Sequence, residues 1–376
     1  MRAPTLYALP NQRVLRWLVT TREPLGEDLL RQLMAGPFSS RGAMFVGALN
    51  SLLISWTCAF LHPTPIFIGW MILDTLIWLT RLVLLHCIHL MDSLAPPWLS
   101  EVSLLLGLLW TATLGLGTAA CVLSGDVVLQ VLGCTSAVAM NGAVTMRNQG
   151  IPRYAFLQIL LTDVPMKLAT LLQPEPLLRL FLLQAPLYLT ANWILLHALN
   201  RTLVRALTAE ADSRWHATHD NLTGLYNRAG ILALLEGALH RPRSWPGSVA
   251  VFYIDLDDFK GVNDSRGHAA GDRLLRTCGE VLTLSVRQSD FAGRLGGDEF
   301  LLVMQDATEE GARELAQRIL GRLMPQGTSA SIGIALQRAT EDSPALLARA
   351  DQALYTSKLA GKGGFRLADT RASDAG

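Results

Sequence analysis

The chain has 376 residues, half of them hydrophobic, and a net charge of +1. This length predicts two or three domains, and so small a charge excludes a strongly basic nucleic-acid-binding surface, so no nucleic-acid partner is expected. Neither a disulfide framework nor a zinc site is expected, because the cysteines are odd in number and irregularly spaced: Cys58, Cys87, Cys121, Cys134 and Cys278.

Residues 1–42 are polar and rich in arginine, with no short apolar core followed by a cleavage site. They are therefore not a secretory signal peptide, and we expect helical stretches around 11–20 and 27–35. About six apolar segments follow, each close to the ~20 residues that a helix needs to cross a bilayer. These segments predict an all-α transmembrane bundle with spans near 43–62, 66–90, 101–122, 126–146, 153–173 and 177–199.

Positive charge predicts the orientation of these spans. Arginines crowd the segment before the first span and follow the fourth and sixth spans, whereas the loops after the first, third and fifth spans lack Lys and Arg. Because positively charged loops stay on the cytoplasmic side, both ends of the chain are expected in the cytoplasm. The protein is thus predicted to be a multi-pass membrane protein in contact with lipid.

Four charged residues lie within the apolar segments: Asp74 and Arg81 in the second, Asp163 and Lys167 in the fifth. Asp163 and Lys167 are four residues apart, so they share one helical face and could neutralise each other. A structural ion pair and a ligand pocket are both open interpretations.

A pair of histidines, His86 and His89, lies near the inner end of the second span. Their spacing would allow binding of a metal or haem, but a location at the membrane interface is the favoured interpretation.

The chain from about residue 191 to 218 is predicted to be one helix that leaves the membrane. Small and apolar residues recur along it at three- and four-residue spacing, which fits either a coiled-coil seam or a solitary amphipathic linker. The residues of this seam are Leu199, Leu203, Ala206, Glu210, Ser213 and Ala217.

The remaining sequence predicts an α/β domain. Strands are expected at 249–254, 291–295, 301–304, 329–336 and near 365, and helices at 227–240, 271–286, 308–323 and 343–360. A loop is expected at 241–247 and a disordered tail at 369–376.

Two acidic clusters in this domain predict a site for a hard cation. Asp298 and Glu299 directly follow Gly296-Gly297, which is expected to be a two-glycine turn between two strands. Asp255 ends the strand 249–254. If that strand lies beside the hairpin, Asp255 and Asp298 meet at one metal, as in metal-assisted nucleotidyl transfer.

These residues resemble the GGDEF family, the diguanylate cyclases, over about residues 216–367. The motifs that carry the resemblance occur in the family's order: Asp220-x-Leu222-Thr223-Gly224-Leu225-x-Asn227-Arg228, Phe259-Lys260-x-x-Asn263-Asp264, Gly267-His268-x-x-Gly271-Asp272, Gly296-Gly297-Asp298-Glu299-Phe300 and Tyr355-x-x-Lys358. The implied fold is a nucleotidyl-cyclase palm with an antiparallel-containing sheet flanked by helices.

The resemblance implies a role for each site residue. Mg²⁺, or Mn²⁺, would be held by Asp255, Asp298, Glu299 and the carbonyl of Leu256, and Asp298 or Glu299 would help to deprotonate the attacking hydroxyl. The GTP substrate would be bound by side chains and by the backbone after the first strand. These residues are Lys260, which also acts in catalysis, Asn263 and Asp272 at guanine, His268 at the loop, and Lys358, Lys362, Asp258 and Phe259 at phosphate.

Two further positions concern regulation and affinity. Arg287-x-x-Asp290 matches the family's inhibitory site for cyclic di-GMP. Lys362 stands where the family has arginine, so it keeps the charge but loses the bidentate fork.

The predicted organisation is a cytoplasmic segment (1–42), a transmembrane sensor (43–199), a signalling helix (200–219), a GGDEF domain (220–368) and a tail (369–376). The expected function is that of a homodimeric, product-inhibited diguanylate cyclase in a bacterial inner membrane. Of the two interpretations of the helix 191–218, the family resemblance favours the coiled-coil stalk of a dimer. The alternatives are an inactive domain that binds GTP or cyclic di-GMP, and a transporter with a regulatory tail.

Overall fold

The computed structural model describes residues 8–20, 25–39, 41–89, 96–240, 248–339 and 341–369. It divides into two compact units, Met1–Ala209 and Glu210–Gly376. The predicted loop 241–247 and all but the first residue of the predicted tail lie outside the described residues.

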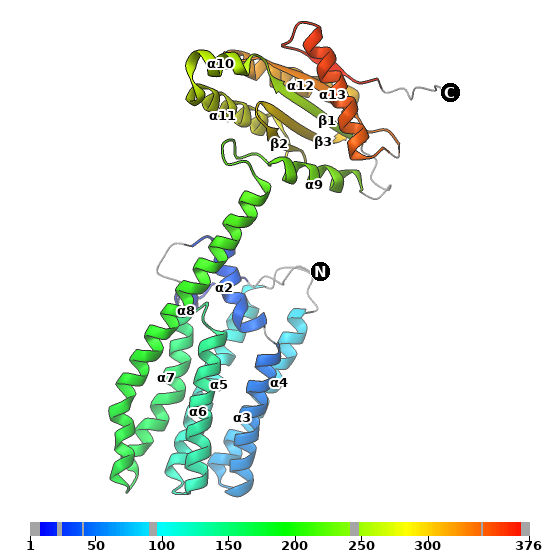
Figure 1. The fold of residues 1–376 in the computed structure, drawn as a ribbon. Helices are drawn as coiled ribbons and strands as arrows, with labels where there is room; N and C mark the ends of the chain where they lie inside the picture. The colour runs from blue at the N-terminus through cyan, green and yellow to red at the C-terminus, as the bar shows by residue number, and fades with distance from the viewer. Residues whose placement is uncertain are drawn as a thin grey trace. The chain divides into compact units, whose positions relative to one another are not determined.

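The N-terminal unit is helical (Figure 1). The six predicted spans are confirmed as helices long and apolar enough to cross a membrane, and the sixth runs on without a break through the predicted signalling helix. The helices are α1 (Arg13–Val19), α2 (Glu27–Ser39), α3 (Arg41–Leu61), α4 (Pro65–His89), α5 (Pro97–Leu123), α6 (Val127–Arg147), α7 (Pro152–Ala169) and α8 (Leu180–Thr218), with 3-10 turns η1 (Thr170–Leu172) and η2 (Pro176–Arg179) before α8.

Local chemistry sets where these helices begin. Pro65, Pro97 and Pro152 each occupy the first helical position, where proline's missing N–H costs no hydrogen bond. The third span therefore begins at Pro97 rather than at the predicted residue 101. Asp126 caps α6 by accepting hydrogen bonds from the backbone N–H of Val128 at 2.7 Å and of Leu129.

Polar side chains lie inside this helical unit. Asp163 and Lys167 form an ion pair at 2.8 Å, and both side chains are buried, so the structure contains the ion pair that the sequence allowed. His86 is exposed, and the side chain of His89 lies outside the described residues. No three side chains of His, Cys, Asp or Glu in the described part of the chain surround a metal-sized site.

The five cysteines of the described residues are free thiols. The Sγ atoms of Cys58 and Cys121 nevertheless lie 3.5 Å apart in the interior.

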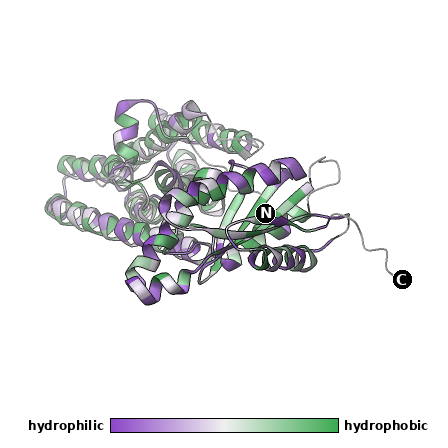
Figure 2. Ribbon diagram, turned by 90° about the horizontal axis from the view of Figure 1, so that it is seen from above, coloured by the Kyte–Doolittle hydropathy of each residue, from purple (hydrophilic) through white to green (hydrophobic). Residues whose placement is uncertain are grey.

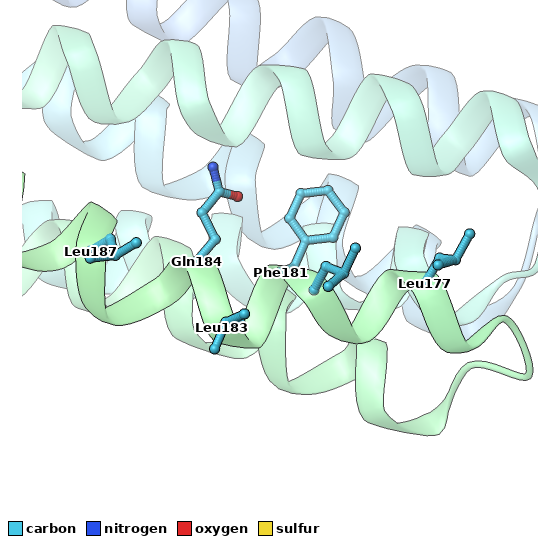
Figure 3. Close-up of a pocket in the computed structure, with 6 residues that line it drawn as sticks. Leu177, Phe181, Leu183, Gln184 and Leu187 are labelled. Carbon is cyan, nitrogen blue, oxygen red and sulfur yellow. The ribbon is translucent and has the colours of Figure 1, made fainter.

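A shallow apolar groove runs along η2 and the start of α8 (Figure 3). Its volume is about 470 Å³, and Gln184 is its one polar lining residue among Leu177, Leu180, Phe181, Leu183 and Leu187.

The C-terminal unit is built on a five-stranded sheet of order β2-β3-β1-β4-β5 (Figure 1). All neighbouring pairs are antiparallel except β4 and β5, which are parallel, so the predicted mixed α/β fold is confirmed. The strands are β1 (Ser248–Leu256), β2 (Phe291–Gly296), β3 (Glu299–Ala307), β4 (Ala330–Leu336) and β5 (Phe365–Leu367). The helices are α9 (Arg228–Leu239), α10 (Phe259–Arg266), α11 (His268–Ser285), α12 (Glu309–Leu323) and α13 (Ser343–Leu359), with a 3-10 turn η3 (Met324–Gln326).

The central strand β1 is apolar on both faces, as a strand covered by helices on both sides must be. Alternation sends Phe252 and Ile254 into the core formed with α11 and α12, and Val249 and Val251 into the core formed with α9 and α13. Figure 2 shows the strands of the sheet as mainly hydrophobic. This sandwiching fixes the register of β1 and therefore the place where its acidic end emerges.

Three local predictions were wrong. The turn between β2 and β3 consists of Gly297 and Asp298, because Gly296 already pairs with Glu299. Helix α10 was not predicted, although it begins directly after the first acidic cluster. Helix α11 begins at His268 rather than at residue 271, since Gly267, with φ +77°, separates it from α10.

Candidate functional site

The two acidic clusters meet at the end of β1. Asp255 lies opposite Glu299 on β3 and opposite Ser331 on β4. The backbone N–H of Leu256 donates to the carbonyl of Asp298 at 3.3 Å. Strand pairing thus brings together carboxylates that are some forty residues apart in the chain.

The electrostatics at Asp255 favour a cation. Burial raises the pKa of the Asp255 carboxyl, and the nearby charges of Asp298 and Asp257 add to this effect. The ammonium of Lys358 opposes it, with Nζ 2.8 Å from Oδ2 of Asp255, but the pKa stays above its ordinary value. Lys358 was predicted to meet phosphate, and in the structure its ammonium is paired with Asp255.

Carboxylate and carbonyl oxygens of this kind are the ligands that a hard divalent ion prefers. Asp255, Asp298 and the carbonyl of Leu256 are neighbours on β1 and the hairpin turn. Glu299 lies on the same strand pair, and the hydroxyl of Tyr253 donates to its Oε2 at 3.4 Å. Because no three acidic, His or Cys side chains of the described ranges form a closed metal cage, the remaining ligands would come from backbone, water and substrate oxygens.

The segment after β1 turns sharply into α10. Asp258 has a left-handed conformation, with φ +56°, and its side chain makes no capping hydrogen bond to α10, which begins at Phe259. Among the described residues the first N–H groups of α10 thus lack a side-chain cap, and such groups can bind an anion. Asp258 and Lys260 are exposed. The predicted phosphate-binding backbone therefore lies immediately beyond the predicted metal ligands.

The predicted guanine-binding residues lie where α10 meets α11. Gly271 sits against Asn263, and any larger residue there would collide with the Asn263 amide. The Oδ1 atom of Asn263 is buried and has no hydrogen-bond partner among the described residues. Asp272 follows Gly271 and is half-buried, whereas His268 is exposed. An unpartnered acceptor beside a carboxylate suits the donor edge of a guanine base.

Two residues that sequence reasoning missed hold the site in shape. Asp257 accepts hydrogen bonds from Ser329 Oγ and Ser331 Oγ, both at 2.8 Å, and from the backbone N–H of Gly363 at 2.9 Å. It therefore fixes the turn after α13 that carries Lys362. Its place within the first acidic cluster was the available signal, but nothing in the sequence showed these partners.

Arg294 is the second missed residue, and it clamps the hairpin turn. Its Nε and Nη2 donate to the carbonyl of Gly297 at 3.0 and 2.7 Å, and its Nη1 lies 3.2 Å from both carboxylate oxygens of Asp220. Burial opposes ionisation of Asp220, but hydrogen bonds from Thr223 and the charge of Arg294 outweigh it, so the pKa of Asp220 is lowered. The turn that bears Asp298 is thereby tied to the Asp220 motif.

The predicted regulatory pair has two different surroundings. Arg287 is exposed. Asp290 is buried, and its carboxylate accepts hydrogen bonds from the backbone N–H groups of Arg287 and Gln305, both at 3.1 Å. Asp290 thus holds the turn between α11 and β2, while the guanidinium of Arg287 is accessible. Lys362 is also exposed, in a left-handed conformation with φ +61°.

The part of the chain that contains these residues matches a known family. Residues 217–364 match the family model described as diguanylate cyclase, GGDEF domain. The chain is 40% identical over 160 residues to the probable diguanylate cyclase DgcE of Escherichia coli K12. The matched region covers 40% of this chain and 14% of that protein. It is 36% identical over 163 residues to diguanylate cyclase DgcS of Shewanella oneidensis MR-1, covering 42% of this chain and 55% of the relative.

One relative has a different name: the cyclic di-GMP phosphodiesterase PdeR of E. coli K12 is 37% identical over 158 residues, 40% of this chain and 24% of that protein. Among solved structures, the GGDEF domain of DgcB from Caulobacter crescentus in complex with c-di-GMP is 27% identical and covers 40% of this chain and 96% of that one, with a TM-score of 0.39. The chain thus spans about half or less of the curated relatives described above.

Proposed function

We propose that this chain, whose residues 217–364 form a GGDEF domain, is a diguanylate cyclase that condenses two GTP molecules into cyclic di-GMP and two pyrophosphates. The observation that carries the proposal is the pairing of β1 with β3, which sets Asp255 beside the Gly297–Asp298 turn. Enzymes that transfer nucleotides need carboxylates at such a point, because a metal must neutralise phosphate charge there.

Asp255, Asp298 and the carbonyl of Leu256 would hold Mg²⁺ or Mn²⁺, with Glu299 close by. When bound, the ion supplies neutralisation of the phosphates and activation of the attacking hydroxyl. Asp298 or Glu299 accepts the proton of that hydroxyl. The Arg294 clamp holds the carbonyl of Gly297 and so restrains the turn that carries Asp298.

Polar and charged residues around the end of β1 would bind the GTP substrate. Asn263 and Asp272 accept the N–H groups of guanine, which discriminates against adenine because their own polar atoms would otherwise remain unpaired. Lys260, Lys362 and the backbone of Asp258 and Phe259 bind the triphosphate, and His268 shapes the loop beside them. Lys358 releases Asp255 to a metal and turns to phosphate, its predicted partner.

Cyclic di-GMP contains two guanylates, so two GTP-loaded domains must face each other, and we infer a homodimer. Helix α8, which continues from the sixth span to Thr218, would be the signalling stalk at the dimer axis. The six apolar helices would anchor the chain in a bacterial inner membrane with both ends in the cytoplasm, where GTP is available. The apolar groove of η2 and α8 would face lipid chains (Figure 3).

Product inhibition is part of the proposal. The exposed guanidinium of Arg287 can donate two parallel hydrogen bonds to a guanine of cyclic di-GMP. Asp290 would act through the turn that it holds, which places Arg287 at the surface.

The alternative is a domain that binds cyclic di-GMP or GTP without making product. It is kept because one relative is named a cyclic di-GMP phosphodiesterase. The deciding experiment is turnover of GTP with Mg²⁺ by the full chain in nanodiscs, with cyclic di-GMP as the measured product. Asp298→Ala should abolish product, whereas Glu314→Ala, on the exposed surface of α12, should not. Equal activity of the Asp298 variant and the unmodified chain would end the cyclase proposal, and tight binding of cyclic di-GMP without turnover would favour the receptor.

A further inference from the structure

The helical unit buries a carboxylate without a counter-charge. Asp74 of α4 is fully buried, and its carboxylate accepts hydrogen bonds from Ser51 Oγ at 2.9 Å and from Ser55 Oγ at 3.1 Å. Both serines are on α3. Within the described ranges of the chain, no Lys, Arg or His forms an ion pair with Asp74. All its partners are therefore neutral hydroxyl groups.

The nearest cation on the same helix lies over two indole rings and, among the described residues, forms no ion pair with Asp74. Arg81 follows Asp74 by about two helical turns, and its guanidinium carbon lies 4.7 Å from the ring centre of Trp78 and 5.5 Å from that of Trp110. Trp110, on α5, also donates from Nε1 to Ser51 Oγ at 3.1 Å. The two indoles, with centroids 5.3 Å apart, thus stand between the carboxylate cluster and the arginine.

The contacts described between the cluster and the other helices are neutral. On the face of α3 that carries Ser51 and Ser55, the next titratable group is the thiol of Cys58, which contacts Cys121 of α5. The link from α3 to α6 is also neutral, a hydrogen bond of 3.0 Å from Asn50 Nδ2 to Ser136 Oγ.

The other buried carboxylate described in this unit, Asp163, has the counter-charge that Asp74 lacks. Asp163 has the ammonium of Lys167 at 2.8 Å, so its charge is compensated within α7. An ionised carboxylate with only hydroxyl donors is strongly unfavourable in an apolar interior, and more so between lipid-facing helices. Asp74 therefore requires a positive partner that the described side chains do not supply.

We propose that Asp74 is a proton-binding site of the helical unit. A proton from solvent adds to one carboxylate oxygen, and the resulting O–H donates to Ser51 or Ser55. Hydroxyl groups can both donate and accept, so the same serines can partner both forms, and Ser51 can keep the hydrogen bond from Trp110.

Proton uptake removes one negative charge from the contact between α3, α4 and α5, and so changes the hydrogen bonds that join these helices. The bound species is a proton rather than a metal ion, since the carboxylate and its two hydroxyls already lie at hydrogen-bonding distance from one another. The site is independent of the cyclase proposal, because it belongs to the other unit of the chain.

The test is infrared difference spectroscopy of the full chain in nanodiscs over a range of pH. The carbonyl stretch of a protonated carboxyl should be present and should be lost in Asp74→Asn. The matched control is the double variant Asp163→Asn, Lys167→Met, which removes the other buried carboxylate with its cation and should leave that band in place. The readout does not depend on GTP turnover.

A second variant keeps the test decisive if Asp74→Asn fails to fold. Ser51→Ala retains the carboxyl but removes a hydrogen-bond partner, so the band should shift in frequency rather than vanish. A folded Asp74→Asn protein with an unchanged spectrum would overturn the proposal. So would a band that ignores Ser51→Ala, or an Asp74 carboxylate that stays ionised at every pH and responds to added sodium.

Discussion

Removal of the Arg294 side chain should loosen the hairpin that carries Asp298. In Arg294→Met the carbonyl of Gly297 loses two donors and Asp220 loses its only ion-pair partner among the described residues. With about 1 kcal/mol for each of the lost contacts, the hairpin should be destabilised by about 2–3 kcal/mol. That free energy corresponds to a roughly 30- to 150-fold faster exchange of the protected amides of β2 and β3.

The effect has a defined pH dependence. The pKa of Asp220 is lowered in the folded chain, so its ionised form stabilises the fold fully above the ordinary aspartate pKa of about 3.9. This contribution is lost as the pH falls through the lower folded-state pKa. The difference between the unmodified chain and Arg294→Met should therefore be complete at neutral pH and shrink in acid.

Hydrogen–deuterium exchange of the full chain, followed by mass spectrometry of peptides from 291–307, measures this difference. Arg294→Lys should recover only part of the protection, because an ammonium cannot reach both Gly297 and Asp220 with a fork. Arg276→Met, at an exposed position of α11, is the control. If exchange of the hairpin in Arg294→Met matches that of the control, the clamp has no energetic role and the reasoning is refuted.

Three more predictions concern single side chains. Lys362→Arg should lower the KM for GTP by about threefold, on the order of 0.6 kcal/mol, because it gains a bidentate phosphate contact; an unchanged or higher KM would count against a phosphate role. Arg287→Ala should relieve inhibition by added cyclic di-GMP without loss of thermal stability. Asp290→Ala should lower the free energy of unfolding by about 1–3 kcal/mol, because it leaves two backbone N–H groups unpaired. Inhibition that persists in Arg287→Ala would argue against the site. Burial raises the pKa of the Cys278 thiol to about 12, so a thiol-alkylating reagent near pH 8 should spare it until the domain unfolds; rapid labelling of the native chain, detected by mass spectrometry, would contradict its burial.

The sequence predicted those parts of the fold that depend on short-range patterns. Alternation along β1 and the six apolar segments are local signals, and both correspond to elements of the structure. The position of the hairpin turn was wrong by one residue, because the register with β3, rather than the glycine pair, decides which residues turn. Helix α10 was missed because its eight residues are mostly polar and carry little apolar periodicity.

The long-range polar contacts could not be predicted. Asp257 looked like one more acidic residue of its cluster, and only the pairing of β1 with β4 reveals that it is bonded to Ser329 and Ser331. Asp74 and Asp163 differ already in the sequence, because only Asp163 has a lysine one helical turn away on its own helix. The sequence could not show that the partners of Asp74 are the hydroxyls of Ser51 and Ser55 on another helix.

The contacts of the Asp220 motif connect the end of α8 to the hairpin turn that carries Asp298. The N–H of Asn227 donates to the carbonyl of Thr218 at the end of α8, and the N–H of Tyr226 donates to Ala292 of β2. The ring of Tyr226 lies 4.5 Å from that of His219, which stacks on Trp215 at 3.6 Å.

From this anchored segment, Asp220 reaches Arg294, and Arg294 reaches the carbonyl of Gly297. Each step is a hydrogen bond, an ion pair or a ring contact, and we expect a shift at the end of α8 either to break one of these contacts or to move the turn that carries Asp298. A change of geometry at the end of α8 would therefore act directly on the position of Asp298, the carboxylate to which we assign a catalytic role in the proposed function.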